Sequence, residues 1–332
     1  MLAVTALLAP LADSLPKAVA SRGQGGWLAP LAALPILLLW VTLLAAVAGK
    51  NGMDLGTALE KRLGKTGRIL CSVLYIMWGT VLLALRMDAS ARRMGVIYGQ
   101  GAGRTIGALT VVLALWLVWR RGTAALCRAG ELFWPVMGVA AAAVILLTLP
   151  QLRFQRLWSG RGWSGLPGGT ADCLAAFAPA VLAFALPETD GKRKGGGRRL
   201  RKWAAVLCLL SLGLLAAVVG QLGTGLAARL DQPFLTMVQG ISLQGSLARP
   251  EGLAAALWLV ADFAFAGLVI GSAARLAGGR WSRPAAALTA AVGVVGHTLT
   301  FWQPVALWGA VLLGLFLPVL LWLPNKMHKG KP

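Results

Sequence analysis

The chain has 332 residues, of which 58% are hydrophobic and only 13% charged, and its mean hydropathy is +0.72. This composition excludes an ordinary soluble protein, because repeated apolar runs of about 20 residues are what helices need to cross a bilayer about 30 Å thick. The formal charge of +21 could indicate a nucleic-acid partner. However, the basic residues lie between apolar runs and do not alternate with aromatic residues, so none is expected.

The apolar runs predict an all-α membrane protein with ten transmembrane helices in one polytopic domain, residues 1–332. In chain order, the predicted spans are 2–20, 27–48, 68–85, 105–119, 124–149, 171–186, 203–227, 252–274, 284–300 and 304–323. The segment 50–67 predicts a short amphipathic surface helix, with Leu55, Leu59 and Leu63 on one stripe. Residues 325–332 form a short basic tail.

Lysine and arginine residues in the connections predict the orientation. Alternate connections, beginning with the one after the second span and including the tail, hold 21 of the 32 Lys and Arg residues. The poorer side includes Arg86, Arg92 and Arg93, assigned to the connection after the third span. Basic connections favour the cytoplasm, so both termini are predicted to be cytoplasmic. The seven basic residues of Lys192–Lys202 are expected to contact anionic lipid headgroups, with an acidic partner as the alternative.

Prolines predict breaks in the first and sixth spans, which contain Pro10 and Pro16, and Pro179 and Pro187, respectively. An unwound segment at membrane depth is stable only where protein or water satisfies its backbone, so broken helices line cavities. Breaks five spans apart predict two inverted five-helix repeats with a small-molecule site between them. The alternative is that these prolines only kink the two helices and mark no binding site. The repeats would cover about 1–150 and about 170–324.

Polar residues near these breaks and within the spans are the candidate site residues, because a charge at membrane depth is costly unless it is paired or hydrated. The predicted ligand-binding residues are Asp13, Ser14, Phe184, Glu188 and Asp262. For Asp262 there are two interpretations: its carboxylate forms a structural hydrogen bond within the bundle, or it has a coupling or gating role. The sequence has two histidines and no hydrolase or metalloprotease motif, so no enzyme activity, metal or cofactor is expected.

The fifth span opens with GTAALCRAGELFWP, residues 122–135. This segment resembles the fifth-helix signature of the spore-germination permease family, the B subunits of nutrient germinant receptors. Two further segments are similar to that family: LEKRLGKTGRILCSVLYIMWG, 59–79, and QPFLTMVQGISLQGSLARPEGLAAALWL, 232–259. Arg128 and Glu131 lie three residues apart on one helix face, so we expect them to pair and, with Pro135, to serve a structural or gating role.

The resemblance implies a member of the amino acid–polyamine–organocation superfamily, with ten helices in an inverted-repeat fold. It further implies a protein of the spore inner membrane, or of the cell membrane, that binds a small nutrient such as an amino acid. Its partners would be the A-type and C-type receptor subunits. A secondary amino-acid transporter and a structural subunit with a vestigial cavity are the alternatives. The sixth span departs from the family, because only about 16 apolar residues, or roughly 24 Å of helix, precede TDGKRKGGG.

Overall fold

The computed structural model describes residues 1–23, 25–48, 54–158, 163–186, 196–241, 250–296 and 302–322. Within these residues the chain is all-helical and contains no β-strand. Nine of the described helical segments are long and apolar enough to cross a membrane. The prediction of an all-α, multi-pass membrane protein is therefore confirmed.

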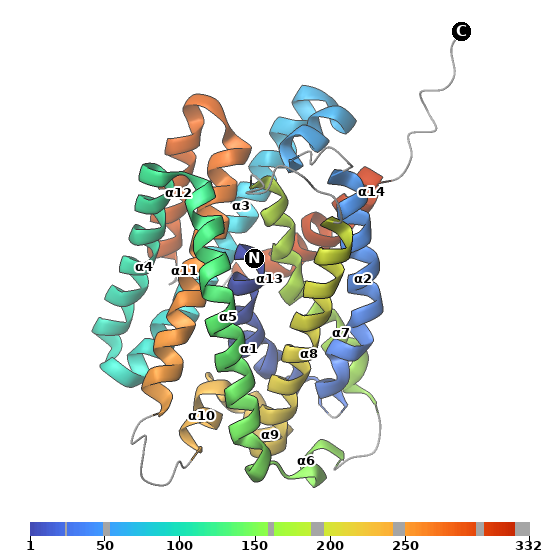
Figure 1. Ribbon diagram of the computed structural model, residues 1–332, viewed down its shortest axis with the longest axis vertical. Helices are drawn as coiled ribbons and strands as arrows, with labels where there is room; N and C mark the ends of the chain where they lie inside the picture. The colour runs from blue at the N-terminus through green and yellow to red at the C-terminus, as the bar shows by residue number, and fades with distance from the viewer. Residues whose placement is uncertain are drawn as a thin grey trace.

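The helices of the first half are α1 (Leu2–Ser21), η1 (Gly26–Leu28), α2 (Ala29–Ala48), α3 (Leu55–Tyr98), α4 (Gln100–Arg121), α5 (Thr123–Thr148), η2 (Leu149–Gln151) and α6 (Phe154–Trp158). Those of the second half are α7 (Gly165–Phe177), η3 (Ala178–Ala185), α8 (Gly196–Leu222), α9 (Thr224–Arg229), α10 (Pro233–Gln239), α11 (Pro250–Ala277), η4 (Gly279–Trp281), α12 (Ser282–Val295), α13 (Trp302–Gly309), η6 (Ala310–Phe316) and α14 (Leu317–Trp322). In Figure 1 the long helices stand upright as a bundle, and the short helices α6, α9 and α10 gather at one end of it.

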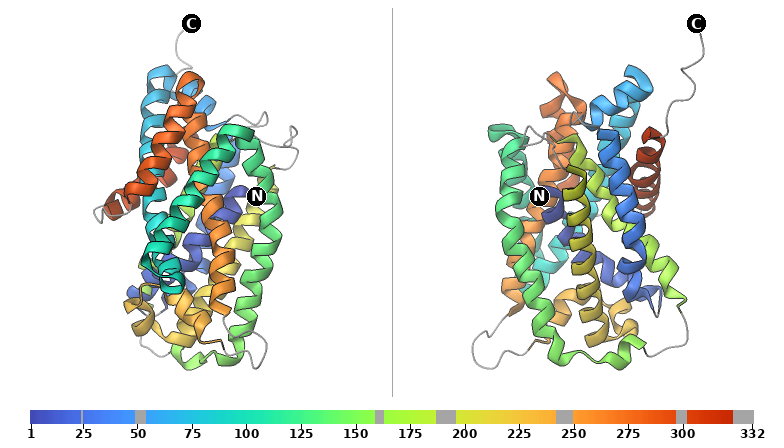
Figure 2. Two further views of the ribbon diagram at one scale, coloured as in Figure 1. Left: turned by 90° about the vertical axis from the view of Figure 1, so that its left-hand side faces the viewer. Right: turned by 45° about the vertical axis from the view of Figure 1, so that its right-hand side comes forward.

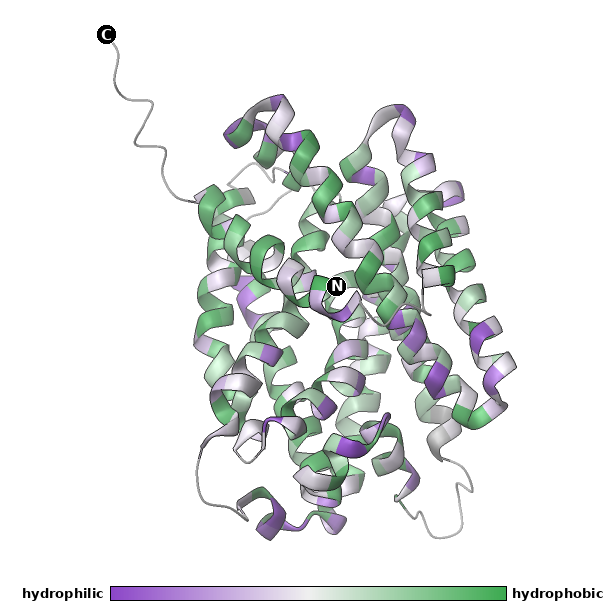
Figure 3. Cartoon of the chain, turned by 180° about the vertical axis from the view of Figure 1, so that it is seen from behind, coloured by the Kyte–Doolittle hydropathy of each residue, from purple (hydrophilic) through white to green (hydrophobic). Residues whose placement is uncertain are grey.

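The core lies where α1 and α11 cross the middle of this bundle. α1 packs against α5, α7, α8, α9 and α11, and α11 packs against α3, α4 and α12 as well. Figure 2 shows the N-terminal end of α1 about midway along the bundle in both views, so α1 runs from the middle toward the end that carries α9 and α10. In Figure 3 hydrophilic residues interrupt helices of that half of the bundle that are otherwise hydrophobic.

The predicted break in the first span is wrong. α1 is a continuous α-helix from Leu2 to Ser21, with Pro10 and Pro16 inside it. Each proline removes a single intrahelical hydrogen bond and leaves the neighbouring bonds in place. Most side chains of α1 are buried among its neighbours, and this packing on several sides holds the helix together through both prolines.

The sixth span changes its winding but is not shortened. α7 ends at Phe177, and the chain continues as the 3₁₀-helix η3, with proline in its first turn, before Leu186 adopts an extended conformation. The span covers 21 residues, 165–185, because the GLPGGT sequence at its start is helical. At about 1.5 Å per α-helical residue and about 2.0 Å per 3₁₀ residue, it is roughly 35 Å long. The expectation of a truncated sixth helix is therefore wrong, and Pro187 lies outside the described residues.

The third span is longer than predicted, because the apolar run and the polar segments on both sides of it form one helical element of 44 residues. A kink at Gly64 separates the amphipathic segment from the span, and its φ of 75° is readily adopted by glycine alone. Leu55 and Leu59 of the predicted stripe are buried, whereas Leu63 is exposed. At the other end the helix continues past Leu85 to residue 98, which takes Arg86 and Arg93 out of the predicted connection and into the bundle.

The ninth predicted span, 284–300, is helical from Ser282 to Val295 in the part of the chain that the structure describes, which is 14 residues. Residues 297–300 of that span lie outside the described residues. The last span is continuous from Trp302 to Trp322 and contains the π-helical stretch η6. Carbonyl groups of this rod accept hydrogen bonds from Trp40, Tyr75 and Trp78, which anchor α2 and α3 to it.

The predicted pair at the start of α5 does not form. Arg128 and Glu131 are both exposed and described, and no ion pair joins them. An exposed pair of this spacing contributes only about 0.2–0.5 kcal/mol, so solvation of the two groups competes with it. Between them, Gly130 packs directly against α1: an added Cβ would lie 2.5 Å from the Cα of Leu2, and the Gly130 carbonyl accepts the Thr5 hydroxyl at 3.1 Å. The motif therefore joins α5 to α1 through a glycine. Pro135 is exposed within the continuous helix α5.

Replacement of Gly130 by alanine is expected to destabilise the protein by about 1–3 kcal/mol, because the new methyl group overlaps the backbone of α1. Thermal unfolding of the purified protein in detergent measures this as a lower melting temperature. Gly138→Ala on the same helix is the control, since its Cβ would make only ordinary contacts at 3.7 Å with Trp134. Equal melting temperatures for the two variants would contradict the close packing of α5 on α1.

Candidate functional site

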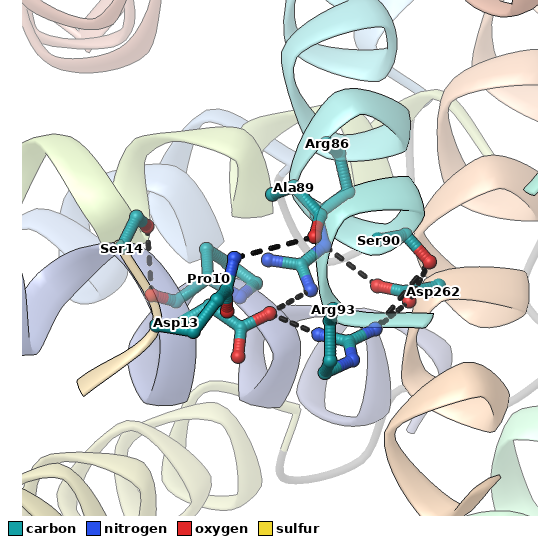
Figure 4. Close-up of polar contacts among 9 residues, drawn as sticks. Pro10, Asp13, Ser14, Arg86, Ala89, Ser90, Arg93 and Asp262 are labelled. Atoms are coloured by element: carbon teal, nitrogen blue, oxygen red, sulfur yellow. Dashed lines mark hydrogen bonds and ion pairs between the residues drawn. The ribbon is translucent and has the colours of Figure 1, made fainter. Parts of the chain in front are cut away.

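Two arginines of α3 meet two aspartates from other helices in the interior of the bundle. Arg86 and Arg93 are seven residues apart, which is close to two turns, so they project from the same face of α3. Asp13 comes from α1 and Asp262 from α11. None of these four side chains belongs to a residue that is more than 4% exposed. We call them the ion cluster, and Figure 4 shows how they converge.

Each arginine of the ion cluster contacts both aspartates. Arg86 donates from Nε to Asp262 Oδ1 at 2.6 Å and from Nη2 to Asp13 Oδ2. Arg93 donates from Nη1 to the same oxygen of Asp13 and from Nη2 to Asp262 Oδ2. Ser90, which lies between the arginines on α3, donates its hydroxyl to Asp262 Oδ2 at 2.6 Å. The ion cluster therefore ties α1 and α11 to α3.

The ion cluster is tolerated at this depth because its charges sum to zero and all four groups are paired. A buried ion pair contributes little net stability, since desolvation offsets the attraction between its charges. Removal of one partner is different, because it leaves a buried charge without compensation and costs about 3–5 kcal/mol. The ion cluster therefore specifies the arrangement of the three helices and does little to raise overall stability.

The two aspartates are not equivalent. Both oxygens of Asp262 accept hydrogen bonds. Asp13 receives both arginines on Oδ2, and its buried Oδ1 has no hydrogen-bond partner among the described residues. Only one of the two carboxylate oxygens of Asp13 therefore accepts hydrogen bonds from the described residues.

A cavity of about 570 Å³ lies beside Asp13 and Arg86. Its walls come from α1, α3, α7, η3, α9, α11, α13 and η6 and from the segment between α9 and α10. This volume is in the range of small-molecule sites. Its outer part is lined by three ion pairs with more exposed side chains: Lys17–Asp231, Arg22–Asp172 and Arg92–Asp88. The Asp231 and Arg22 side chains are 78% and 50% exposed, respectively, so the cavity opens at the end of the bundle that carries α9 and α10.

Outside the membrane-spanning segments, the outer pairs shift the pKa of their members. The hydrogen bond and the charge of Lys17 lower the pKa of Asp231, and the hydrogen bond and the charge of Asp172 raise the pKa of Arg22. A carboxylate whose pKa is lowered by folding contributes stability above its unfolded pKa and loses that contribution as the pH falls through the lowered value. The attraction of Lys17 for Asp231 is therefore lost in acid, as the carboxylate becomes protonated.

The structure brings together two of the five predicted ligand-binding residues. Asp13 and Asp262 join the same ion cluster, although only Asp13 lines the cavity. Ser14 also lines the cavity and donates its hydroxyl to the Pro10 carbonyl at 2.8 Å. Phe184 lies on η3 and packs against the hydrophobic core, and it is not among the residues that line the cavity. Glu188 lies outside the described residues.

The two arginines are the functional residues that sequence reasoning missed. They were assigned to a connection because the apolar run ends at Leu85. The sequence does carry a signal: LALRMDASARRM contains neither glycine nor proline, and Arg86, Ser90 and Arg93 follow a spacing of four and three residues. This spacing places all three on one helix face.

Asp262→Asn is expected to destabilise the protein by about 3–5 kcal/mol, because Arg86 and Arg93 would then share a single buried carboxylate. The double variant Asp262→Asn with Arg93→Gln restores charge balance and should recover part of this loss. Thermal unfolding in detergent measures both effects, with Asp88→Asn in the more exposed Asp88–Arg92 pair as the control. A double variant no more stable than Asp262→Asn would show that charge balance is not what the ion cluster requires.

The sequence has no match among known protein family models, and no curated protein matches it. The function of the site is therefore inferred from two sources. One is the geometry of the ion cluster and cavity, and the other is the set of sequence motifs in the third, fifth and eighth spans.

Proposed function

We propose that the protein is a permease-like membrane subunit that binds a small nutrient, such as an amino acid, as the B-type component of a spore-germination receptor. The observation that carries this proposal is the cavity between the first and sixth spans. α1 contributes Pro10 and Ser14 to its wall, and the sixth span contributes Ala175, Ala176 and Pro179. A site between these two spans is what an inverted-repeat transporter fold is expected to have.

The finer fold assignment forms part of the proposal. Ten helices would be arranged as two inverted repeats, about 1–150 and about 170–324, with α12 in the place of the ninth helix. The continuous α1 means that the cavity does not depend on an unwound first helix. It depends on the polar face that α1 presents, because Asp13, Ser14 and Lys17 all line the wall.

The distribution of charge supports an orientation in which the cavity opens to the outside. The alternate connections that hold 21 of the 32 Lys and Arg residues include those after α2, α4 and α11, and these three lie at the end of the bundle opposite α6, α9 and α10 (Figure 1). Burial of Arg86 and Arg93 removes two basic residues from the poorer side, so the bias toward the other side increases. A nutrient outside the membrane would then reach the cavity directly.

In the proposed receptor, an occupied cavity changes how α1 packs against its neighbours, and the A-type and C-type subunits respond to that change. This mechanism needs an element with two arrangements whose balance the ligand alters. α1 fits the role because it lines the cavity and is joined to α3 and α11 through the ion cluster. The basic residues of 192–202 would contact anionic headgroups. The four that the structure describes, Arg198, Arg199, Arg201 and Lys202, are exposed.

A secondary amino-acid transporter is the second candidate function. The observation in its favour is a pair of carboxylates, Asp13 and Asp262, buried at membrane depth, where such groups often couple transport to an ion. The structural subunit with a vestigial cavity receives less support, because its basis was a truncated sixth helix and the sixth span is long enough to cross the bilayer.

Ala176→Trp is expected to weaken nutrient binding at least tenfold, because the indole ring would occupy the cavity. The measurement is thermal stabilisation of the protein in lipid nanodiscs by a panel of amino acids. Ala171→Trp is the matched control, since Ala171 lies on the exposed face of the same helix.

Uptake of a bound amino acid into proteoliposomes separates the two functions: a transporter accumulates it, and a receptor subunit does not. Spores of a host that lacks its own B subunits should germinate with that nutrient only when this protein and its partner subunits are present. If no amino acid stabilised the protein and Ala176→Trp behaved like Ala171→Trp, the nutrient-binding proposal would fail.

A further inference from the structure

A second cavity lies where α3, α4 and α12 pack against one another. It holds about 260 Å³, and it shares no lining residue with the cavity described above. We call it the side groove. Its volume is below the range of about 300–1,000 Å³ that is typical of small-molecule sites, so it suits one part of a larger ligand. The residues that line it are Met87, Ala91, Arg104, Thr105, Gly107, Ala108 and Val294.

The side groove opens because α3 and α4 diverge. A Cβ added at Gly103 would lie 2.6 Å from the backbone nitrogen of Gly95, so the two helices touch backbone to backbone at this level. One turn further along α4, a Cβ added at Gly107 would meet nothing nearer than the carbonyl oxygen of Met87 at 3.8 Å, which is an ordinary contact. The helices therefore separate within one turn, and Gly107 forms the floor of the gap between them.

The helix faces beside the side groove are lipid-facing. On the membrane-spanning helix α4, the side chains of Leu109, Val112 and Trp116 are more than half exposed and follow one another at three and four residues, which places them on one face. On α12, Leu288 and Val295 are also more than half exposed and lie two turns apart. Large apolar side chains exposed on a membrane-spanning bundle contact acyl chains, so an acyl chain is what lies next to this cavity.

Arg104 is the only charged residue among the described residues that line the side groove. Its side chain is exposed and forms no ion pair or hydrogen bond with the described part of the chain, whereas Arg22 and Arg92 are each paired with an aspartate. Arg104 lies four residues after the start of α4, or about 6 Å along a helix that spans the membrane. An arginine near the end of a span extends its guanidinium group to the headgroup region.

We propose that the side groove binds an anionic phospholipid, with the lipid phosphate on the guanidinium group of Arg104 and one acyl chain over Gly107. The planar fork of N–H donors on arginine matches a phosphate group. Among the described lining residues none is acidic, so nothing there would pair with the cation of a zwitterionic headgroup. The binding of this lipid does not depend on the proposed nutrient function, because the nutrient cavity has other walls.

A lipid in the side groove contacts α3, α4 and α12 at once and therefore stabilises their packing. The same α3 carries the two arginines of the ion cluster, and Met87 of the groove directly follows Arg86. A ligand that binds only the folded arrangement raises the melting temperature in proportion to its occupancy. The bound lipid is thus measurable through the stability of the whole bundle.

The test uses the full-length protein in a neutral detergent, with phosphatidylglycerol, phosphatidylcholine of the same acyl chains, and glycerol phosphate as probes. Native mass spectrometry counts bound lipids, and thermal unfolding measures stabilisation. We expect phosphatidylglycerol to stabilise the protein more than phosphatidylcholine does, and glycerol phosphate to have no effect. Equal effects of the two lipids would overturn the role of charge. Stabilisation by glycerol phosphate as large as that by phosphatidylglycerol would overturn the role of the acyl chain.

Variants locate the effect in the side groove, because basic residues elsewhere on the protein also attract phosphatidylglycerol. Arg104→Gln should lower the affinity for the most tightly bound phosphatidylglycerol about tenfold. Arg153→Gln is its control, since Arg153 is also exposed but does not line the groove. Gly107→Leu should exclude the acyl chain, and its control is Gly101→Leu on the same helix, where an added Cβ meets nothing within 4 Å.

The proposal would be contradicted by an Arg104→Gln variant that binds phosphatidylglycerol as tightly as Arg153→Gln does. Equal lipid binding by Gly107→Leu and Gly101→Leu would contradict it as well. Melting temperatures without lipid show whether each variant is folded. The comparison of phosphatidylglycerol with glycerol phosphate uses the native protein, so the test of the acyl chain does not depend on the folding of Gly107→Leu.

Discussion

The arrangement of the bundle depends on one constraint, which is that two carboxylates and two guanidinium groups buried at membrane depth have to neutralise one another. α3 supplies both cations from a single face, two turns apart, and so fixes where α1 and α11 lie relative to it. Hydrophobic packing alone would allow these helices to slide or rotate against each other, because many apolar surfaces of similar shape pack about equally well. Such a movement would separate the buried charges, and a buried charge without a partner is costly.

The cavity follows from the same constraint. It lies beside Asp13 and Arg86 of the ion cluster, and its outer part is lined by three ion pairs whose side chains are more exposed. The ion pairs of the ion cluster are buried, whereas the three pairs of the outer part are partly exposed to solvent.

Backbone irregularities in this fold occur where other groups compensate for them. Two prolines leave α1 continuous because its neighbours enclose it, and the sixth span tightens into a 3₁₀-helix that lengthens it. The last span contains a π-helical stretch, and carbonyls in and near that stretch accept side-chain donors from α2 and α3. Three of these departures contribute to the cavity wall: α1 through Pro10, η3 through Pro179 and the π-helical stretch through Ala310.

The sequence by itself determined the helical membrane class and the position of nearly every span, because twenty consecutive apolar residues have one stable form in lipid. It also identified Asp13 and Asp262 as unusual, since their isolated charges in apolar runs are visible in the sequence. Only the tertiary structure decided that the two carboxylates share one pair of arginines, that Gly130 and not Arg128 or Glu131 joins α5 to α1, and that Gln232 meets α3. The partners of Arg86 lie 73 and 176 residues away along the chain, and no local pattern records such a distance. A span becomes helical because its own backbone groups must form hydrogen bonds within the segment when lipid surrounds it. Ion pairs form only where the faces of helices that are distant in the sequence come into contact.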